Sequence, residues 1–376
     1  PLITKHNLTI DGYSQPGSAP NSNPILAANN AQIKIVLDSR NGNHTLMDFA
    51  GTSPNDQTGY GDTEAATLGI LEATNVTVRG VSIISAPLTA NPAGEQTALY
   101  GISFAKGAQG HVSGNWIGVE PNGTNLFGPA DGVTGFRYRV RDVNNAVLND
   151  ILVNNVVIGV KAGSANAPAE FNVITGIPAI PIIIEGQGTR ISGNFFGVYP
   201  DGVRDFNPSF DPVLTGFFEG HIEIGRSGNN TLIGTDGDGV NDANERNIFG
   251  GVAPPELGGY DHAIEFYGNS PGTNIVVAGN YFGIGVDGVS RFVNGAPLLG
   301  IGGGSTVYRF GSDFDGISDD LEGNVAYNNW PEVTFPSFGP GDFLISLSTT
   351  ATVSARGNRL INNYPFPVSP LRLSGE

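Results

Sequence analysis

The chain lacks several features that mark common classes of protein. It contains no cysteine among its 376 residues, so a disulfide framework is excluded. No apolar run approaches the roughly 18 residues of a membrane-spanning helix, and we expect no membrane insertion. Only 18 basic residues face 35 acidic ones, and a formal charge of −17 should repel nucleic acid. Amphipathic helical windows are also scarce, which argues against an α-helical fold.

Glycine and proline are abundant instead, at 55 and 25 residues. Between them lie short runs of β-branched and aromatic residues, each bounded by Gly, Asn or Asp. In the aligned runs the two flanking residues are apolar and the middle one varies, as in Ile182–Ile184, Ile222–Ile224 and Ile264–Phe266. This alternation predicts an all-β fold of many short strands, with the flanking residues inside and the middle residue outside.

Two sequence elements alternate along the chain. The first is a Gly-Asn box followed by an Asn-Gly or Asp-Gly turn, at Gly114–Gly118, Gly193–Gly197 and Gly279–Gly283, with a degraded copy at Gly357. The asparagines of successive boxes are spaced almost evenly along the chain. The second element pairs a glycine with a later asparagine at a constant distance, as in Gly159 and Asn172. Alternating repeats predict stacked units in one elongated body.

The repeat favours a parallel β-helix. The shortest spacing between equivalent asparagines is 22 residues, from Asn172 to Asn194, which is about one coil of three short strands. The longer interval between successive boxes then corresponds to about three coils, and the whole chain to about 12–14. The asparagines should form a ladder in which each amide bonds to the next and to turn backbone. A β-propeller is the alternative, although its blades need ~40–50 residues.

Several segments resemble a known superfamily. Residues 8–24, the boxes at 114–124 and 193–202, and residues 233–250 are similar to repeats of bacterial secreted right-handed parallel β-helix proteins of the pectate-lyase-like superfamily. The resemblance implies a right-handed, single-stranded parallel β-helix, secreted or displayed on a bacterial surface. It does not decide function, because that superfamily includes lyases, hydrolases, adhesins and non-catalytic modules.

We therefore expect one β-helix domain over residues 1–376, with a loop insertion at 39–67 and a C-terminal tail at 364–376. The first residues show no signal peptide, and we expect a chain trimmed from a precursor or taken from a larger surface protein.

The second element carries a candidate metal site in two of its copies. Alternating carboxylates with a glycine at the turn are typical of Ca²⁺ ligands. The alternative is a plain Asp-Gly turn, since aspartate bonds its own backbone. The third copy, from Gly159, keeps Glu170 but loses the aspartates. The candidate ligands are Asp236, Asp238, Asp242, Asp313, Asp315 and Asp319. No organic cofactor is expected.

A candidate catalytic group lies on the aligned runs. Glu223 and Glu265 occupy the same outward position, with His221 expected outward beside Glu223 and His262 just before the second run. On successive coils the two backbones would lie about 5 Å apart, and with one coil between them about 10 Å. Both separations are near those of glycosidase carboxylate pairs. A solvated acidic face is the alternative.

A basic stripe provides candidate substrate-binding residues. In a strand, Tyr138 would point one way and Arg137, Arg139 and Arg141 the other. Such a stripe suits a carboxylated sugar, and β-elimination would also need a base such as Lys161. The alternative is ion pairing with nearby acids. Tyr260 is a further candidate contact. Aromatic residues of the boxes, such as Trp116 and Phe195, are expected in the core or as a platform for sugar rings.

The sequence thus predicts an extracellular β-helix module that binds or organises polysaccharide or a cell-surface glycan. Further copies of the chain, or the rest of a larger surface protein, are additional candidate partners. A polysaccharide lyase or glycoside hydrolase acting on an acidic or neutral glycan is the alternative. The expected location is secreted or on the cell surface.

Overall fold

A computed structural model describes most of the repeated region. The described residues are 1–40, 45–48, 63–84, 99–105, 107–124, 140–142, 153–177, 181–184, 186–206, 220–224, 228–251, 262–266, 273–292, 299–301, 307–328, 345–347, 352–362 and 372–373.

The protein is all-β, and nearly all of its strands lie in three parallel sheets. The first sheet contains, in order, β1 (Leu2–Ile3), β5 (Thr63–Leu71), β8 (Leu99–Ala105), β11 (Val140–Asp142), β14 (Ile182–Ile184), β17 (Ile222–Ile224), β20 (Ile264–Phe266), β23 (Leu299–Ile301), β26 (Ile345–Leu347) and β29 (Arg372–Leu373).

The second sheet contains β2 (Thr9–Asp11), β6 (Val76–Arg79), β9 (Gly110–Ser113), β12 (Val157–Gly159), β15 (Arg190–Ser192), β18 (Leu232–Gly234), β21 (Ile275–Ala278), β24 (Val307–Gly311) and β27 (Thr352–Arg356). The third contains β3 (Ile35–Asp38), β7 (Val81–Ile84), β10 (Trp116–Ile117), β13 (Asn172–Ile174), β16 (Asn194–Phe196), β19 (Ile248–Phe249), β22 (Tyr281–Phe282), β25 (Val325–Asn328) and β28 (Arg359–Asn362).

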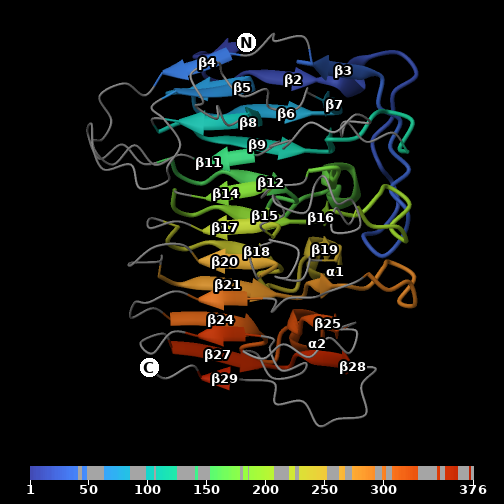
Figure 1. Ribbon diagram of the computed structural model, residues 1–376, viewed down its shortest axis with the longest axis vertical. Helices are drawn as coiled ribbons and strands as arrows, with labels where there is room; N and C mark the ends of the chain where they lie inside the picture. Colours follow the sequence, from blue (N-terminus) through green and yellow to red (C-terminus); the bar gives the residue numbers. More distant parts are fainter. Residues whose placement is uncertain are drawn as a thin grey trace, which may run out of the picture.

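The chain visits the three sheets in one cyclic order. Within the described residues it passes nine times through the first, second and third sheets before β29 returns to the first. We call each pass a coil. In Figure 1 the coils are stacked along the long axis, with the two termini at opposite ends. This arrangement is compatible with a parallel β-helix, and the described strands make fewer coils than the 12–14 expected.

The core lies between the inner faces of all three sheets. Ile222, Ile224 and Ile233 are buried in it, as the alternation predicts. Phe196, Phe249 and Phe282 stack on one another from successive strands of the third sheet, with ring centroids 5.0 and 4.7 Å apart. Because this separation matches the strand spacing of about 4.8 Å, identical side chains on successive coils can pack face to face.

The expected asparagine ladder is confirmed. Each side-chain amide donates to the Oδ1 of the next asparagine at 2.9–3.3 Å, and most also donate to a strand carbonyl. The ladder contains Asn115, Asn172, Asn194, Asn247, Asn280, Asn324 and Asn358. It supplies partners to turn backbone that would otherwise be buried and unsatisfied.

The ladder also corrects the length of the repeat. Successive steps are 57, 22, 53, 33, 44 and 34 residues long. The interval from one box to the next therefore contains two coils, and not three, because most coils carry connections longer than expected. This is why the described strands make fewer coils than the shortest spacing indicated.

Long loops alternate between two corners of the body. Between the second and third sheets they occupy residues 160–171, 235–246 and 312–323 on every second coil, and contain η2 (Ala167–Glu170), α1 (Asp242–Glu245) and α2 (Asp319–Glu322). The first and second of these loops touch through the amide of Asn241, which donates to the Ser164 carbonyl at 2.6 Å. A helical turn is about 10 Å wide, or two strand spacings, so such loops fit only on alternate coils.

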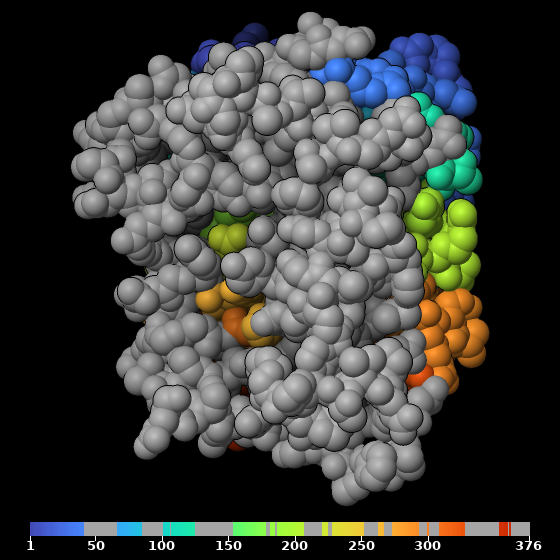
Figure 2. Space-filling model, in the orientation of Figure 1, coloured from blue at the N-terminus to red at the C-terminus, as the bar shows by residue number. Residues whose placement is uncertain are grey.

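At the corner after the third sheet, the boxes of the intervening coils form a second series of loops. Residues 118–124, 198–206 and 284–292 protrude one below another at the right edge of Figure 2, in teal, yellow-green and orange. The backbone of Val286 donates to the carbonyl of Gly202 at 3.0 Å, which joins two of them. The alternation of the two sequence elements is therefore the alternation of coils with loops at different corners.

Residues 15–34, which we call the strap, run along the outer face of the third sheet (Figure 1, blue, at the right). Ile25 and Ile33 are buried against a second apolar cluster that includes Trp116, Phe195 and Ile248. The strap is held by backbone bonds from Ile25 to the Asn244 side chain and from Asn29 to the Pro200 carbonyl. Trp116 and Phe195 are thus covered and form no open platform for sugar rings.

The expected insertion and tail both contain strands. Within residues 39–67, β4 (Thr45–Asp48) pairs antiparallel with β5, and within residues 364–376, β29 extends the first sheet. Among the described residues, the helices are all too short to cross a membrane.

Candidate functional site

The outer face of the first sheet carries a column of register-matched positions. Reading across successive strands, the column contains Ser103, Arg141, Ile183, Glu223, Glu265, Gly300 and Ser346. We call these positions the outer column. Arg141 of the basic stripe and the candidate catalytic residues Glu223 and Glu265 therefore share one column. Parallel in-register pairing places the middle residues of successive strands on one line.

Glu223 and Glu265 are direct neighbours in the outer column. Their strands β17 and β20 pair in parallel with these two residues in register, so they lie on successive coils. Both are half-buried, while Ile222 and Ile264 beside them are buried. The strand spacing of about 4.8 Å therefore separates the two backbones, and both side chains leave the same face.

His262 lies beside this pair. A Cβ added to Gly300, which follows Glu265 in the column, would overlap the His262 ring. The imidazole thus occupies the space that a side chain at position 300 would fill. Burial lowers its pKa to about 4, so the ring is neutral at physiological pH. Its Nδ1 is buried and has no hydrogen-bond partner within the described part of the chain.

His221 does not belong to the exposed face, contrary to the expectation. It is fully buried at the corner between the third and first sheets, with its ring centroid 5.6 Å from that of Phe249. Its Nε2 lies 3.4 Å from the Gly250 carbonyl, and burial lowers its pKa to about 4. Alternation failed here because His221 precedes the strand, where the chain still turns inward.

Most of the basic stripe falls outside the described residues. Arg137, Tyr138, Arg139 and Tyr260 are not described, and for Arg141 only the backbone position in β11 is known. That position is in the outer column, two strands before Glu223. Lys161 lies elsewhere, on the loop between the second and third sheets, with its Nζ 4.0 Å from Glu170. The structure therefore separates this base from the outer column.

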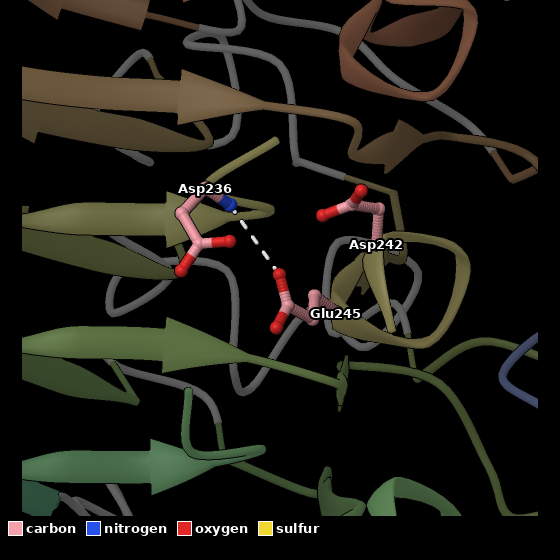
Figure 3. Close-up of side chains that lie close together, drawn as sticks. All are labelled: Asp236, Asp242 and Glu245. Carbon is pink, nitrogen blue, oxygen red and sulfur yellow. Dashed lines mark hydrogen bonds between the residues drawn. The ribbon is translucent and has the colours of Figure 1, made fainter. Parts of the chain in front are cut away.

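The first acidic loop, residues 235–246, contains a dense network of carboxylates and their partners (Figure 3). Asp236, Asp242 and Glu245 bring carboxylate oxygens within 4.8 Å of one another. Arg190 from β15 pairs with two of them, at 2.6 Å from Asp236 and 2.5 Å from Glu245. The second contact is a close ion pair without an aligned hydrogen bond. The single guanidinium of Arg190 thus lies against two of the three carboxylates and offsets part of their negative charge.

The remaining bonds of this loop come from neutral groups. The Thr235 hydroxyl is 2.7 Å from Asp242 and 3.1 Å from Glu245, and the Gly239 amide donates to Asp242 at 2.9 Å. Ser318 of the next acidic loop also donates to Asp242. Asp238 is exposed and accepts only the Val240 amide among the hydrogen bonds found, so Glu245 replaces it in the cluster.

Burial raises the pKa of Glu245 to about 7, although Arg190 opposes this shift. A cation that bound here would have to displace Arg190 or share its partners.

The second acidic loop, residues 312–323, has carboxylates that are more exposed to solvent than those of the first. Asp313, Asp315 and Asp319 come together as predicted, and all three are exposed or half-exposed. Arg309 pairs with Asp313 and, at 3.0 Å, with Glu322, which leaves Asp315 and Asp319 without an arginine among the ion pairs of the described residues.

The glutamate shared by all three loops has a structural role. Its Oε2 accepts the backbone amide two residues after the loop's first glycine, at 3.0 Å for Glu170, 3.3 Å for Glu245 and 3.2 Å for Glu322. This bond closes the loop and explains why Glu170 is present in the copy that has no aspartates. The sequence reasoning missed Arg190 as the partner of Glu245. Arg190 lies in β15, which pairs with the strand before the loop, β18, and its register opposite Leu232 places it beside the acids.

No protein-family model and no curated protein matches this chain.

Proposed function

We propose that this protein is a right-handed parallel β-helix of the pectate-lyase-like kind, secreted or displayed on a bacterial surface, that binds a polysaccharide along its outer column. The observation that supports this is the column itself. It places Glu223, Glu265 and the His262 ring beside one another on a rigid sheet. These three polar groups follow the strand spacing of about 4.8 Å, and such a short polar line suits a segment of an extended polymer better than a compact ligand.

The charge of the site favours a neutral polymer. Carboxylates accept hydrogen bonds from sugar hydroxyls, and such charge-assisted bonds are the stronger ones. A uronic or sulfated polymer would meet two glutamates on a body of net charge −17. We therefore propose a neutral glycan as the ligand.

Co-elution on size exclusion would test the proposal, with a mixed-linkage β-glucan and a galactomannan as neutral polymers and polygalacturonate as the anionic one. We expect a neutral polymer to shift the protein, and added salt to leave the shift unchanged because no ion pair is involved.

Glu265→Arg should weaken this binding at least tenfold by filling the column with a long cationic side chain. Thr77→Arg, at a half-buried outward position of the second sheet, is the matched control and should bind as the wild type does. Equal weakening by both variants, or no binding to any polymer, would contradict the proposal.

A further inference from the structure

We infer that Glu223 and Glu265 form a hydrolytic carboxylate pair that cleaves the bound glycan with retention of anomeric configuration. This inference rests on the proposed function, because it needs the polymer to lie along the outer column. It assigns an activity to two residues that the fold alone leaves as half-buried surface acids.

The separation of the pair is the first argument. In-register residues on neighbouring parallel strands have backbones about 4.8 Å apart, and these two side chains leave the same face. Retaining glycosidases place their carboxyl groups about 5–5.5 Å apart, and inverting ones about 6.5–9.5 Å to admit a water molecule. The register therefore favours the retaining arrangement, with the scissile bond parallel to the column.

The surroundings of the pair are the second argument. On one side of Glu223 the column continues with Ile183, which is only 3% exposed. On the other side of Glu265, the His262 ring fills the space above Gly300. Along the outer column the pair is thus flanked by two uncharged groups, the Ile183 side chain and the His262 ring.

The chemistry needs only water as a co-reactant. One glutamic acid gives its proton to the glycosidic oxygen as the C1–O bond breaks, while the other carboxylate forms an ester bond to C1. Water then attacks C1 of the ester, its proton returns to the first carboxylate, and the C1–O bond to the enzyme breaks. The products are two shorter chains, one with a new reducing end of the original configuration.

A lyase mechanism is not supported by the same residues. Elimination needs a base near a carboxylated sugar, and Lys161 lies on a different corner beside Glu170. Elimination products carry a double bond that absorbs ultraviolet light, which distinguishes them from hydrolysis products.

The experiment uses the full chain with the polymer that binds in the co-elution test. New reducing ends are counted, the configuration of the first product is read by proton NMR, and ultraviolet absorbance is followed. We expect hydrolysis with retention. Glu223→Gln and Glu265→Gln should each lower the rate at least a hundredfold, while binding stays within about threefold of the wild type. Glu72→Gln, at an exposed turn on a distant coil, should leave the rate unchanged.

The outcomes separate the two proposals. A polymer that binds without being cut overturns the inference and leaves the proposed function standing. Absence of binding to every polymer overturns both. Inverted products, ultraviolet-absorbing products, or full activity in either glutamine variant overturn the assignment of the carboxylate pair.

Discussion

At the scale of single residues, the asparagine ladder is the clearest case of one side chain serving several partners. Asn247 accepts from both the backbone and the side-chain amide of Asn194, and its own amide donates to Asn280 and to the Ile191 carbonyl. All of these groups are buried, so none can turn to water instead.

Asn247→Ala should therefore destabilise the protein by about 2–4 kcal/mol, because it leaves several buried donors and acceptors unpaired. Urea unfolding of the variant and the wild type measures this difference. Asn358→Ala, at the half-buried last position of the ladder, is the control and should cost less. Equal losses at both positions would contradict a role for burial.

Glu245 predicts a pH dependence of stability. Its pKa in the folded protein, about 7, is above the ordinary value of 4.5, so the folded state binds its proton more tightly than the unfolded state does. Its contribution to stability is then full below about pH 4.5 and is lost as pH rises through about 7.

Glu245→Gln should remove this dependence, which amounts to about 3 kcal/mol. Melting temperatures between pH 4.5 and 8 would measure it: the wild type should lose stability relative to the variant as pH rises. Glu72→Gln should follow the wild type. A constant difference between wild type and Glu245→Gln across this range would show that Arg190 keeps Glu245 ionised throughout.

At the scale of elements, the strap packs its apolar side chains against strands of several coils in the third sheet. Ile25 is 1% exposed, whereas its neighbour Leu26 is 38% exposed, so the two offer a matched comparison. Ile25→Ala should cost about 2–4 kcal/mol because it leaves a cavity over the third sheet.

Leu26→Ala should cost less than about 0.5 kcal/mol, since its side chain already contacts water. Chemical unfolding gives both values, and limited proteolysis shows whether the strap loosens first. If the two substitutions had equal effects, the strap would not be packed as described.

The two acidic loops should differ in their response to Ca²⁺, which stays a prediction for both. Arg190 compensates two of three carboxylates in the first loop, while Asp315 and Asp319 of the second are paired with backbone amides and a hydroxyl. Oxygen ligands without a competing guanidinium suit a hard cation better.

Added Ca²⁺ should therefore raise the melting temperature of the wild type, and EDTA should reverse this. Asp315→Asn with Asp319→Asn should abolish the shift, whereas Asp236→Asn should keep it. A shift that survives the first pair of substitutions would place the ion elsewhere, and no shift at all would leave the loops as Asp-Gly turns.

At the scale of the whole molecule, the last described coil differs in charge from the acidic body. Arg356 and Arg359 are exposed, and the described residues of β26, β27, β28 and β29 include no Asp or Glu. Among the described residues β27 and β28 are the last strands of their sheets, and charged side chains on an edge strand discourage pairing with another molecule.

Arg356→Ala with Arg359→Ala should therefore promote end-to-end association, measured by sedimentation velocity at several protein concentrations. Arg204→Ala, on a protruding loop, should not change the sedimentation. Unchanged sedimentation of the double variant would mean that the arginines do not protect this edge.

The sequence by itself determined the class of fold, the inward and outward sides of the strands, and the asparagine ladder. These follow from local rules, because alternation and turn residues act within a few positions of the chain. The sequence also predicted the grouping of Asp313, Asp315 and Asp319, because these residues are close together along the chain.

Only the tertiary structure decided which coils are neighbours. The length of chain between Glu223 and Glu265 is compatible with one coil or two, and the parallel register settled on one. Only the tertiary structure likewise shows that Arg190 contacts Glu245, that the strap covers Phe195, and that His221 is buried at a corner between two sheets. Connection lengths vary from coil to coil, so sequence distance alone does not measure height along the stack.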